Sequence, residues 1–133
     1  MRLDHVQVAA PHGCEEVARA FYGGLLGLPE VDKPEPMRAS GGAWFALGAQ
    51  QLHVGVAGDF APATKAHPGL SVTDAELDAL AARLEAAGSP VQWDERLPGV
   101  RRFYTADPFG NRLELLAGSA VAAPGEDAEW PER

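Results

Sequence analysis

DPFGNRLELL, residues 107–116, joins a tight turn to a strand, and the rest of the sequence is interpreted from it. Proline and glycine occupy turn positions within residues 107–111, so the chain reverses direction there. After the turn, leucines alternate with polar residues, which places Leu113 and Leu115 on one face and Glu114 on the other. This pattern is typical of a half-buried strand with one apolar face.

Outward from this stretch, the same order of elements occurs twice along the chain. Strands are expected at 3–8, 43–47 and 51–56 in the first half, and at 67–72, 90–93, 101–107 and 111–116 in the second. Each half also has one helix with an apolar stripe, at about 15–28 and 73–87. Thr73 and Glu76 form a capping box, and Gly88 ends that helix. Residues 33–42 are expected to form a mobile loop, because they are rich in proline, glycine and polar residues.

The two halves are related by a nearly constant offset, which indicates an internal repeat. His5 corresponds to His67 at an offset of 62 residues, and His53 corresponds to Glu114 at an offset of 61. The sequence therefore predicts an α+β fold of two βαβββ modules, repeats 1–57 and 66–118, forming a cupped, mostly antiparallel sheet with helices outside. A ferredoxin-like domain with accidental symmetry is the alternative. Residues 119–133 are small, acidic and proline-containing, and are expected to form a flexible tail.

Composition excludes several classes of function. Apolar residues make up 46% of the 133 residues and charged residues 23%, an ordinary globular balance. The net charge of −8 disfavours binding to nucleic acid. No apolar run is long enough to span a membrane, and the N-terminus does not resemble a signal peptide. Cys14 is the single cysteine, so no internal disulfide forms and a cytoplasmic location is expected.

Four potential metal ligands share the strand face that does not pack on helices. They are His5, His53, His67 and Glu114. Imidazole and carboxylate groups suit zinc, iron, nickel or manganese, and two histidines with one carboxylate suit iron(II) and oxygen chemistry. A lone strand histidine is more often a surface or hydrogen-bonded residue, so the hypothesis depends on the shared face and on a sheet that curls to bring the four together.

LDHVQV (3–8), FYGGLLGLPEV (21–31), HPGLSV (67–72) and DPFGNRLELL (107–116) together resemble the vicinal oxygen chelate superfamily. That superfamily includes glyoxalase I, extradiol dioxygenases, fosfomycin-resistance enzymes and bleomycin-resistance proteins. The resemblance covers residues 1–118 and implies a single glyoxalase-like domain, a homodimer in most relatives, and a divalent metal held by the first and last strands of each module. His5, His53, His67 and Glu114 occupy those positions, and in dimeric relatives one site can draw ligands from two chains.

The resemblance leaves the reaction open. Glyoxalase I has a glutamate at the position of His53, and the fosfomycin-resistance enzymes have a threonine at the position of Gln7, so neither activity transfers directly. The first hypothesis is a metal-dependent enzyme, a lyase, isomerase or dioxygenase-like protein, acting on a small oxygen-rich substrate that chelates the metal. The alternative is a metal-free protein that binds a small molecule or antibiotic, as bleomycin-resistance proteins do. No catalytic base can be named from the sequence.

Further residues near the expected cup are candidates for binding the substrate. They are Gln7, Gln51, Trp44, Arg102 and Tyr104. The neighbouring aromatic residues Phe45 and Phe103 leave open which member of each pair faces the cup, and core packing is the more common role of such rings. Lys65, Arg101 and Arg102 are basic residues that could steer an anionic substrate, although a solvated surface charge is the more common role for each of them.

Overall fold

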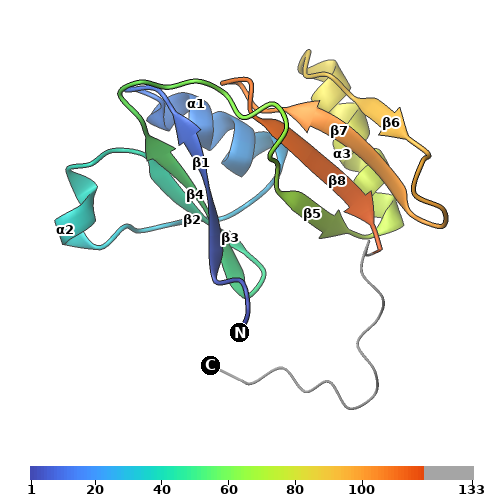
Figure 1. Ribbon diagram of the computed structural model, residues 1–133, viewed down its shortest axis with the longest axis horizontal. Helices are drawn as coiled ribbons and strands as arrows, with labels where there is room; N and C mark the ends of the chain where they lie inside the picture. The colour runs from blue at the N-terminus through green and yellow to red at the C-terminus, as the bar shows by residue number, and fades with distance from the viewer. Residues whose placement is uncertain (119–133) are drawn as a thin grey trace.

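The computed structural model describes residues 1–118, which form two modules of the same design (Figure 1). The first contains β1 (His5–Ala10), α1 (Glu15–Ala18), the π-helix η1 (Arg19–Leu25), β2 (Glu30–Val31), α2 (Glu35–Arg38), β3 (Ala43–Leu47) and β4 (Gln50–Val56). The second contains β5 (Gly69–Val72), α3 (Asp74–Ala86), β6 (Gln92–Asp94), β7 (Arg101–Ala106) and β8 (Arg112–Ala117). The predicted α+β fold of two βαβββ modules is confirmed. The predicted tail, 119–133, lies outside the described residues.

Each module forms its own four-stranded mixed sheet. The strand orders are β1-β4-β3-β2 and β5-β8-β7-β6. In both sheets the first and last strands of the module pair in parallel, and the other pairs are antiparallel. The two potential ligand strands of each module are therefore direct neighbours, because β1 lies beside β4 and β5 lies beside β8.

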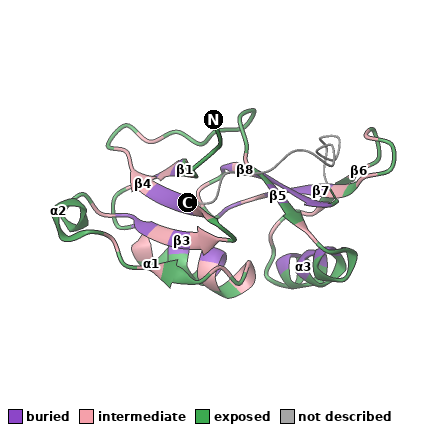
Figure 2. Cartoon of the chain, turned by 90° about the horizontal axis from the view of Figure 1, so that it is seen from below, coloured by how far each residue is buried: buried purple, intermediate pink, exposed green. Residues whose placement is uncertain are grey.

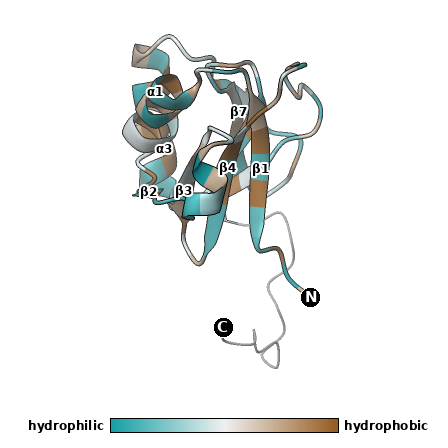
Figure 3. Cartoon of the chain, turned by 90° about the vertical axis from the view of Figure 1, so that its left-hand side faces the viewer, coloured by the Kyte–Doolittle hydropathy of each residue, from teal (hydrophilic) through white to brown (hydrophobic). Residues whose placement is uncertain are grey.

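The helices cover one side of both sheets, and a single hydrophobic core fills the space between the layers. Figure 3 shows α1 and α3 together on one side of the strands. Buried residues concentrate on the strands and on the sides of the helices that face them (Figure 2). One cluster joins Phe45 and Leu52 of the first module to Leu77, Leu84 and Leu115 of the second. Within residues 1–118, α1 and α3 leave the opposite side of each sheet uncovered, and this side is called the helix-free face.

The sequence correctly predicted the start and end of α3 and the bounds of β3. Thr73 Oγ1 accepts the backbone N–H of Glu76 at 3.2 Å, and the Glu76 carboxylate accepts that of Thr73 at 3.2 Å, which completes the predicted capping box. Gly88 follows α3 with φ of +82°, as a left-handed helix end requires. The strand at 43–47 has the predicted bounds.

Other elements differ from the prediction. The segment predicted as one helix begins as α1 and widens into η1, where the backbone N–H of Leu26 reaches the carbonyl oxygen of Phe21. The expected loop at 33–42 contains the short helix α2, and the two-residue strand β2 was not predicted. His67 precedes β5 instead of lying within it, because that strand begins at Gly69. Among the described residues, no helix is long and apolar enough to cross a membrane.

A buried hydrogen-bond network at the 107–111 turn connects the two modules. The Tyr22 hydroxyl in η1 donates to Asp107 Oδ2 at 2.6 Å, and Asn111 Nδ2 donates to the same oxygen at 2.9 Å. Asn111 also donates to the carbonyl of Ala9 in β1 at 2.7 Å and accepts the backbone N–H of Ala63 at 3.0 Å. Asp107 and Asn111 thus hold β1, η1 and the segment between β4 and β5, here called the crossover segment, to the second module.

We expect Tyr22→Phe to lower the free energy of unfolding by about 1.5–3 kcal/mol, because it removes a buried bond to a charged group at constant ring volume. Burial, followed by the charge of Asp107, raises the pKa of the Tyr22 hydroxyl, so the group stays a protonated donor. Urea denaturation measures the change. Arg101→Ala removes exposed ion pairs to Asp74 and Asp78 and an exposed contact with the Trp93 ring, and it serves as the control, with an expected loss of no more than about 1 kcal/mol. Equal losses in the two variants would contradict the role given to the network.

Candidate functional site

The histidines of the first module lie next to each other on the side of the sheet without helices. In the parallel pairing of β1 with β4, His5 is opposite Gln51 and Gln7 is opposite His53, so all four share one face. The His5 and His53 rings stack at 4.5 Å between centroids. Trp44, opposite His53 on β3, stacks on its other side at 3.9 Å with an interplanar angle of 1°. His53 is therefore enclosed between two flat rings.

Hydrogen bonds assign the free ring nitrogens of these two histidines. Asp4 Oδ2 lies 2.9 Å from His5 Nδ1, and Gln51 Oε1 lies 2.8 Å from His53 Nε2. Carboxylate and amide oxygens only accept, so in a neutral imidazole the bonded nitrogen carries the proton. The lone pairs are then on Nε2 of His5 and Nδ1 of His53. A hydrogen bond of this kind to one ring nitrogen commonly orients a metal-ligating histidine.

The environment of His53 favours its neutral form. Its side chain is buried beneath Trp44 and beside His5. Burial first, and then the repulsion of His5, lowers the pKa of His53 below its ordinary value. A neutral imidazole is the form that can donate a lone pair to a metal ion.

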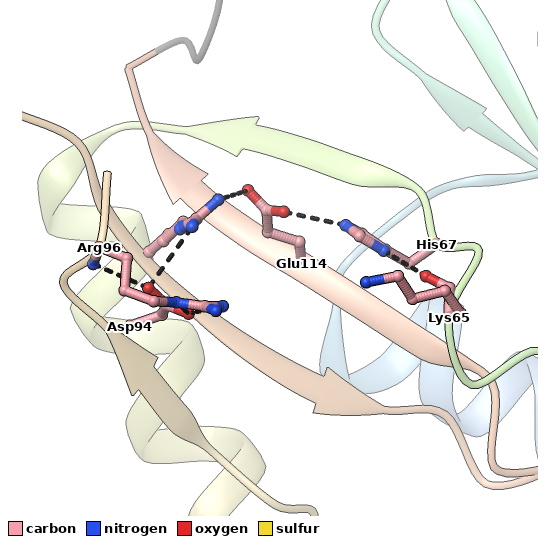
Figure 4. Close-up of polar contacts among 6 residues, drawn as sticks. Lys65, His67, Asp94, Arg96 and Glu114 are labelled. Atoms are coloured by element: carbon pink, nitrogen blue, oxygen red, sulfur yellow. Dashed lines mark hydrogen bonds and ion pairs between the residues drawn. The ribbon is translucent and has the colours of Figure 1, made fainter. Parts of the chain in front are cut away.

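The second module joins His67 directly to Glu114 (Figure 4). His67 Nε2 lies 3.0 Å from Glu114 Oε1, and His67 Nδ1 lies 2.9 Å from the carbonyl oxygen of Lys65. Both neighbours of the ring are acceptors, whereas a neutral imidazole has only one N–H to donate. The contact between His67 Nε2 and Glu114 Oε1 therefore needs a proton, carried by the ring or by the carboxyl group, or a bound cation.

Glu114 also belongs to a row of alternating charges across the second sheet, in which it lies between His67 and Arg102. Arg102 Nη1 lies 3.5 Å from Glu114 Oε2, and Arg102 Nη2 lies 3.4 Å from Asp94 Oδ1. Arg96 Nε donates to Asp94 Oδ2 at 2.8 Å, and that hydrogen bond is the main reason that the pKa of Asp94 is well below its ordinary value. Arg102 Nε is buried and has no hydrogen-bond partner among the described residues. The row keeps the buried Glu114 carboxylate between two positively charged or proton-donating groups.

The four predicted ligands lie in two pairs. His5 and His53 belong to the sheet of the first module, and His67 and Glu114 are in contact in the second. Residues 1–118 of one chain contain no group of three or more histidine, cysteine, aspartate or glutamate side chains that could hold a metal ion. The expected convergence of all four on one point therefore does not occur within a single chain, because the repeat assigns two ligands to each of two separate sheets.

The structure resolves the ambiguity of the aromatic pairs. Phe45 and Phe103 are fully buried in the core, whereas Trp44 stacks on His53 and Tyr104 contacts His67 edge-to-face at 5.4 Å between centroids. Trp44 and Tyr104 thus lie on the same faces as the predicted ligands. Gln7 folds over Gly55 of the neighbouring strand, where an added Cβ would lie 2.5 Å from Gln7 Nε2. Glycine at 55 therefore makes room for this side chain.

Two basic residues behave differently from the expectation. Arg101 extends toward α3 and pairs with Asp74 and Asp78, so it does not belong to the helix-free face. Arg112 was not among the predicted site residues, yet its guanidinium lies 3.8 Å from the centre of the Tyr104 ring. Its position two residues before Glu114 on the same strand gives it the same orientation, and this alternation could have identified it.

Comparisons with known proteins give a consistent result. A family model described as a glyoxalase-like domain matches residues 8–116. The chain is 47% identical to a crystal structure from Bacillus anthracis assigned to the glyoxalase family, covering 90% of this chain and 96% of that one with a TM-score of 0.84. A search of curated proteins finds no match.

More distant structures share the fold. A lactoylglutathione lyase from Agrobacterium tumefaciens is 23% identical, with coverage of 88% and 93% and a TM-score of 0.70. A fosfomycin resistance protein, FosX, from Listeria monocytogenes is 19% identical, with coverage of 89% and 92% and a TM-score of 0.74. The latter was solved with Mn(II) and 1S,2S-dihydroxypropylphosphonic acid. The predicted resemblance to the vicinal oxygen chelate superfamily is confirmed.

In metal-free protein, we expect His53 to titrate below its ordinary pKa of about 6.5. His5→Ala should raise the pKa of His53 only part of the way, because burial is the larger cause. The native state then binds fewer protons than the unfolded chain below about pH 6.5, so the His53 contribution destabilises the fold as the pH falls through that range. Two-dimensional NMR of the imidazole C–H signals in EDTA measures both values. A His53 pKa at or above 6.5 in the parent protein would contradict the enclosed ring stack.

Proposed function

The chain belongs to the glyoxalase-like domain family, and from that premise we propose that it is a metal-dependent enzyme acting on a small, oxygen-rich organic substrate. A divalent ion of the zinc, iron, nickel or manganese type is held by His67 and Glu114 of one chain and by His5 of a second copy. His53, through Nδ1, is a fourth candidate ligand. The protein acts as a homodimer with two equivalent sites.

The observation that carries this proposal is the contact of His67 Nε2 with Glu114 Oε1. The Lys65 carbonyl fixes a ring proton on Nδ1, so the two facing atoms are both electron-pair donors unless one of them carries a proton. Nitrogen and carboxylate oxygen in this relation are suitable ligands for a transition metal. The backbone carbonyl of Lys65 and the guanidinium of Arg102 orient the two ligands from outside, as hydrogen-bonded neighbours of metal sites do.

A second copy is the source of the third ligand in this proposal. No third candidate of the described residues joins His67 and Glu114 within one chain. His5 is about half exposed, and its Asp4 contact directs the lone pair to the opposite ring nitrogen, Nε2. An accessible, oriented imidazole on the edge strand β1 is suited to completing a site across an interface. Closed twofold symmetry would then build two identical sites from four half-sites.

The remaining residues of the helix-free face give the substrate its surroundings. The metal, when bound, supplies Lewis-acid polarisation of substrate oxygens. The Tyr104 hydroxyl and the amides of Gln7 and Gln51 offer hydrogen bonds, and Trp44 offers a flat apolar wall. Arg102, beside Glu114, contributes positive charge. These groups fit the lyase, isomerase and dioxygenase-like reactions equally, so the proposal extends to the class of chemistry and not to one reaction.

Tag-free protein should take up one equivalent of Zn(II), Fe(II), Ni(II) or Mn(II) per chain, as measured by isothermal titration calorimetry and elemental analysis. Glu114→Gln keeps the side-chain shape and removes the anionic ligand, so we expect metal affinity to fall by a hundredfold or more. Glu85→Gln, at an exposed position of α3, is the matched control and should bind like the parent protein. Uptake below a tenth of an equivalent would end the metal proposal. Stabilisation by organic compounds in EDTA would then favour the metal-free binding protein.

A mixing experiment tests the shared site. His5→Ala and Glu114→Gln each disable both sites of their own homodimer, but a mixed dimer retains one site with His5, His67 and Glu114 all intact. Unfolding and refolding the two variants together should therefore restore about a quarter of the parent metal-binding sites, since half of the dimers are mixed. The separately refolded variants provide the baseline. No recovery, with dimers present on a sizing column, would contradict a site built from two chains.

A further inference from the structure

Among the residues that the structure describes, Arg112 is a cation without a counter-ion on the helix-free face. Its guanidinium stacks 3.8 Å from the centre of the Tyr104 ring, and it has no ion pair or side-chain hydrogen bond with residues 1–118. Four other arginines are paired with carboxylates, namely Arg19, Arg96, Arg101 and Arg102. The stacked ring restricts the side chain and leaves its N–H groups available for a ligand.

A pocket lies beside this residue, between the two modules. It has a volume of about 390 Å³ and is bounded by β1, the crossover segment 61–68 and the start of β8. Small apolar residues, among them Ala63 and Ala66, form much of its wall, and Gln7, His67 and Arg112 also line it. A mostly apolar concavity with a few polar groups is typical of sites for small molecules.

The charge around the pocket has the opposite sign to that of the whole protein. Among the described residues that line the pocket, Arg112 is the one whose side chain is always charged, and it is positive in a chain of net charge −8. A divalent ion at His67 and Glu114 would add two more. Local positive charge inside a negative protein selects for an anion and directs it to this place.

We propose that Arg112 binds the acidic group of the substrate in this pocket, which makes the substrate a small organic acid. The guanidinium binds a carboxylate or phosphonate through two parallel N–H···O bonds, with Tyr104 behind it. The other, oxygen-bearing end of the molecule reaches the His67–Glu114 pair. This assignment names the substrate class of the proposed metal site and rests on that proposal, but the anion contact itself needs no metal.

The test uses the full chain in EDTA, titrated by NMR with succinate, 3-phosphonopropionate and the uncharged dimethyl succinate. Parent protein should bind both acids with saturation and the diester at least tenfold more weakly. Arg112→Gln should lose at least tenfold in affinity for both acids. Arg112→Lys keeps the positive charge but cannot donate two parallel N–H···O bonds, and it should lose less. Arg38→Gln removes one positive charge from α2, outside the pocket, and should bind like the parent. The acid that binds more tightly identifies a carboxylate or a phosphonate as the natural group.

Circular dichroism melts establish that each variant is folded, and metal titration separates the two proposals. If Arg112→Gln takes up metal at the parent level but no longer binds the acids, the result supports both the metal site and the anion site. Arg112-dependent acid binding in a protein that takes up no metal supports the anion site and overturns the metal site. Acid affinity within twofold of the parent in Arg112→Gln, equal binding of diester and acid, or no saturable acid binding by the parent would overturn the anion site.

Discussion

The buried contacts of Asp107 and Asn111 are the constraint on which the arrangement of the two modules depends. Each module has its own sheet, and no strand pairing joins one sheet to the other in the described residues. Hydrophobic packing holds modules together but is not directional, so it does not fix their relative position. Three hydrogen bonds do so: Asn111 Nδ2 donates to the Ala9 carbonyl, the Ala63 N–H donates to Asn111 Oδ1, and the Tyr22 hydroxyl donates to Asp107. Leaving any of these buried polar groups without its partner is costly. The same turn begins β8, so the network also positions Glu114.

Glu114 illustrates the balance between stability and function. A carboxylate that is 7% exposed is unfavourable unless opposite charge or donors surround it. Arg102 provides one such group at 3.5 Å, and that long distance leaves Glu114 loosely held. At Oε1 the contact with His67 Nε2 is satisfied only when a proton or a bound cation lies between the two atoms. An apolar residue at 114 would pack without these demands, so the local energetics favour interpreting Glu114 as a functional residue.

The sequence predicts those features of the fold that depend on a single residue type or on the alternation of side chains along a strand. The Thr73–Glu76 box, the glycine after α3 and the faces of the strands all follow from local chemistry or from the period of two. The sequence does not predict how far a strand of one module lies from a strand of the other, because the two modules form separate sheets. Alternation correctly placed His5 and His53 on one helix-free face, whereas His67 lies before its strand. A shared face does not fix a distance, and the separation between the ligands of the two modules depends on how the two sheets pack. The short strand β2 and the widened turn η1 have no period that could be recognised.

Duplication of the module explains why the ligand set is divided evenly. Each copy supplies two candidate ligands, and each pair is already supported by its own protein contacts, His5 by Asp4, His53 by Gln51 and His67 by Lys65. The hydrophobic core is continuous without any of these side chains. Folding of the chain therefore does not require the metal, in contrast to small domains whose structure depends on ligation. A half-site that is stable alone can be combined with another half-site through an interface, and the position of His5 on an edge strand gives such an interface direct access to it.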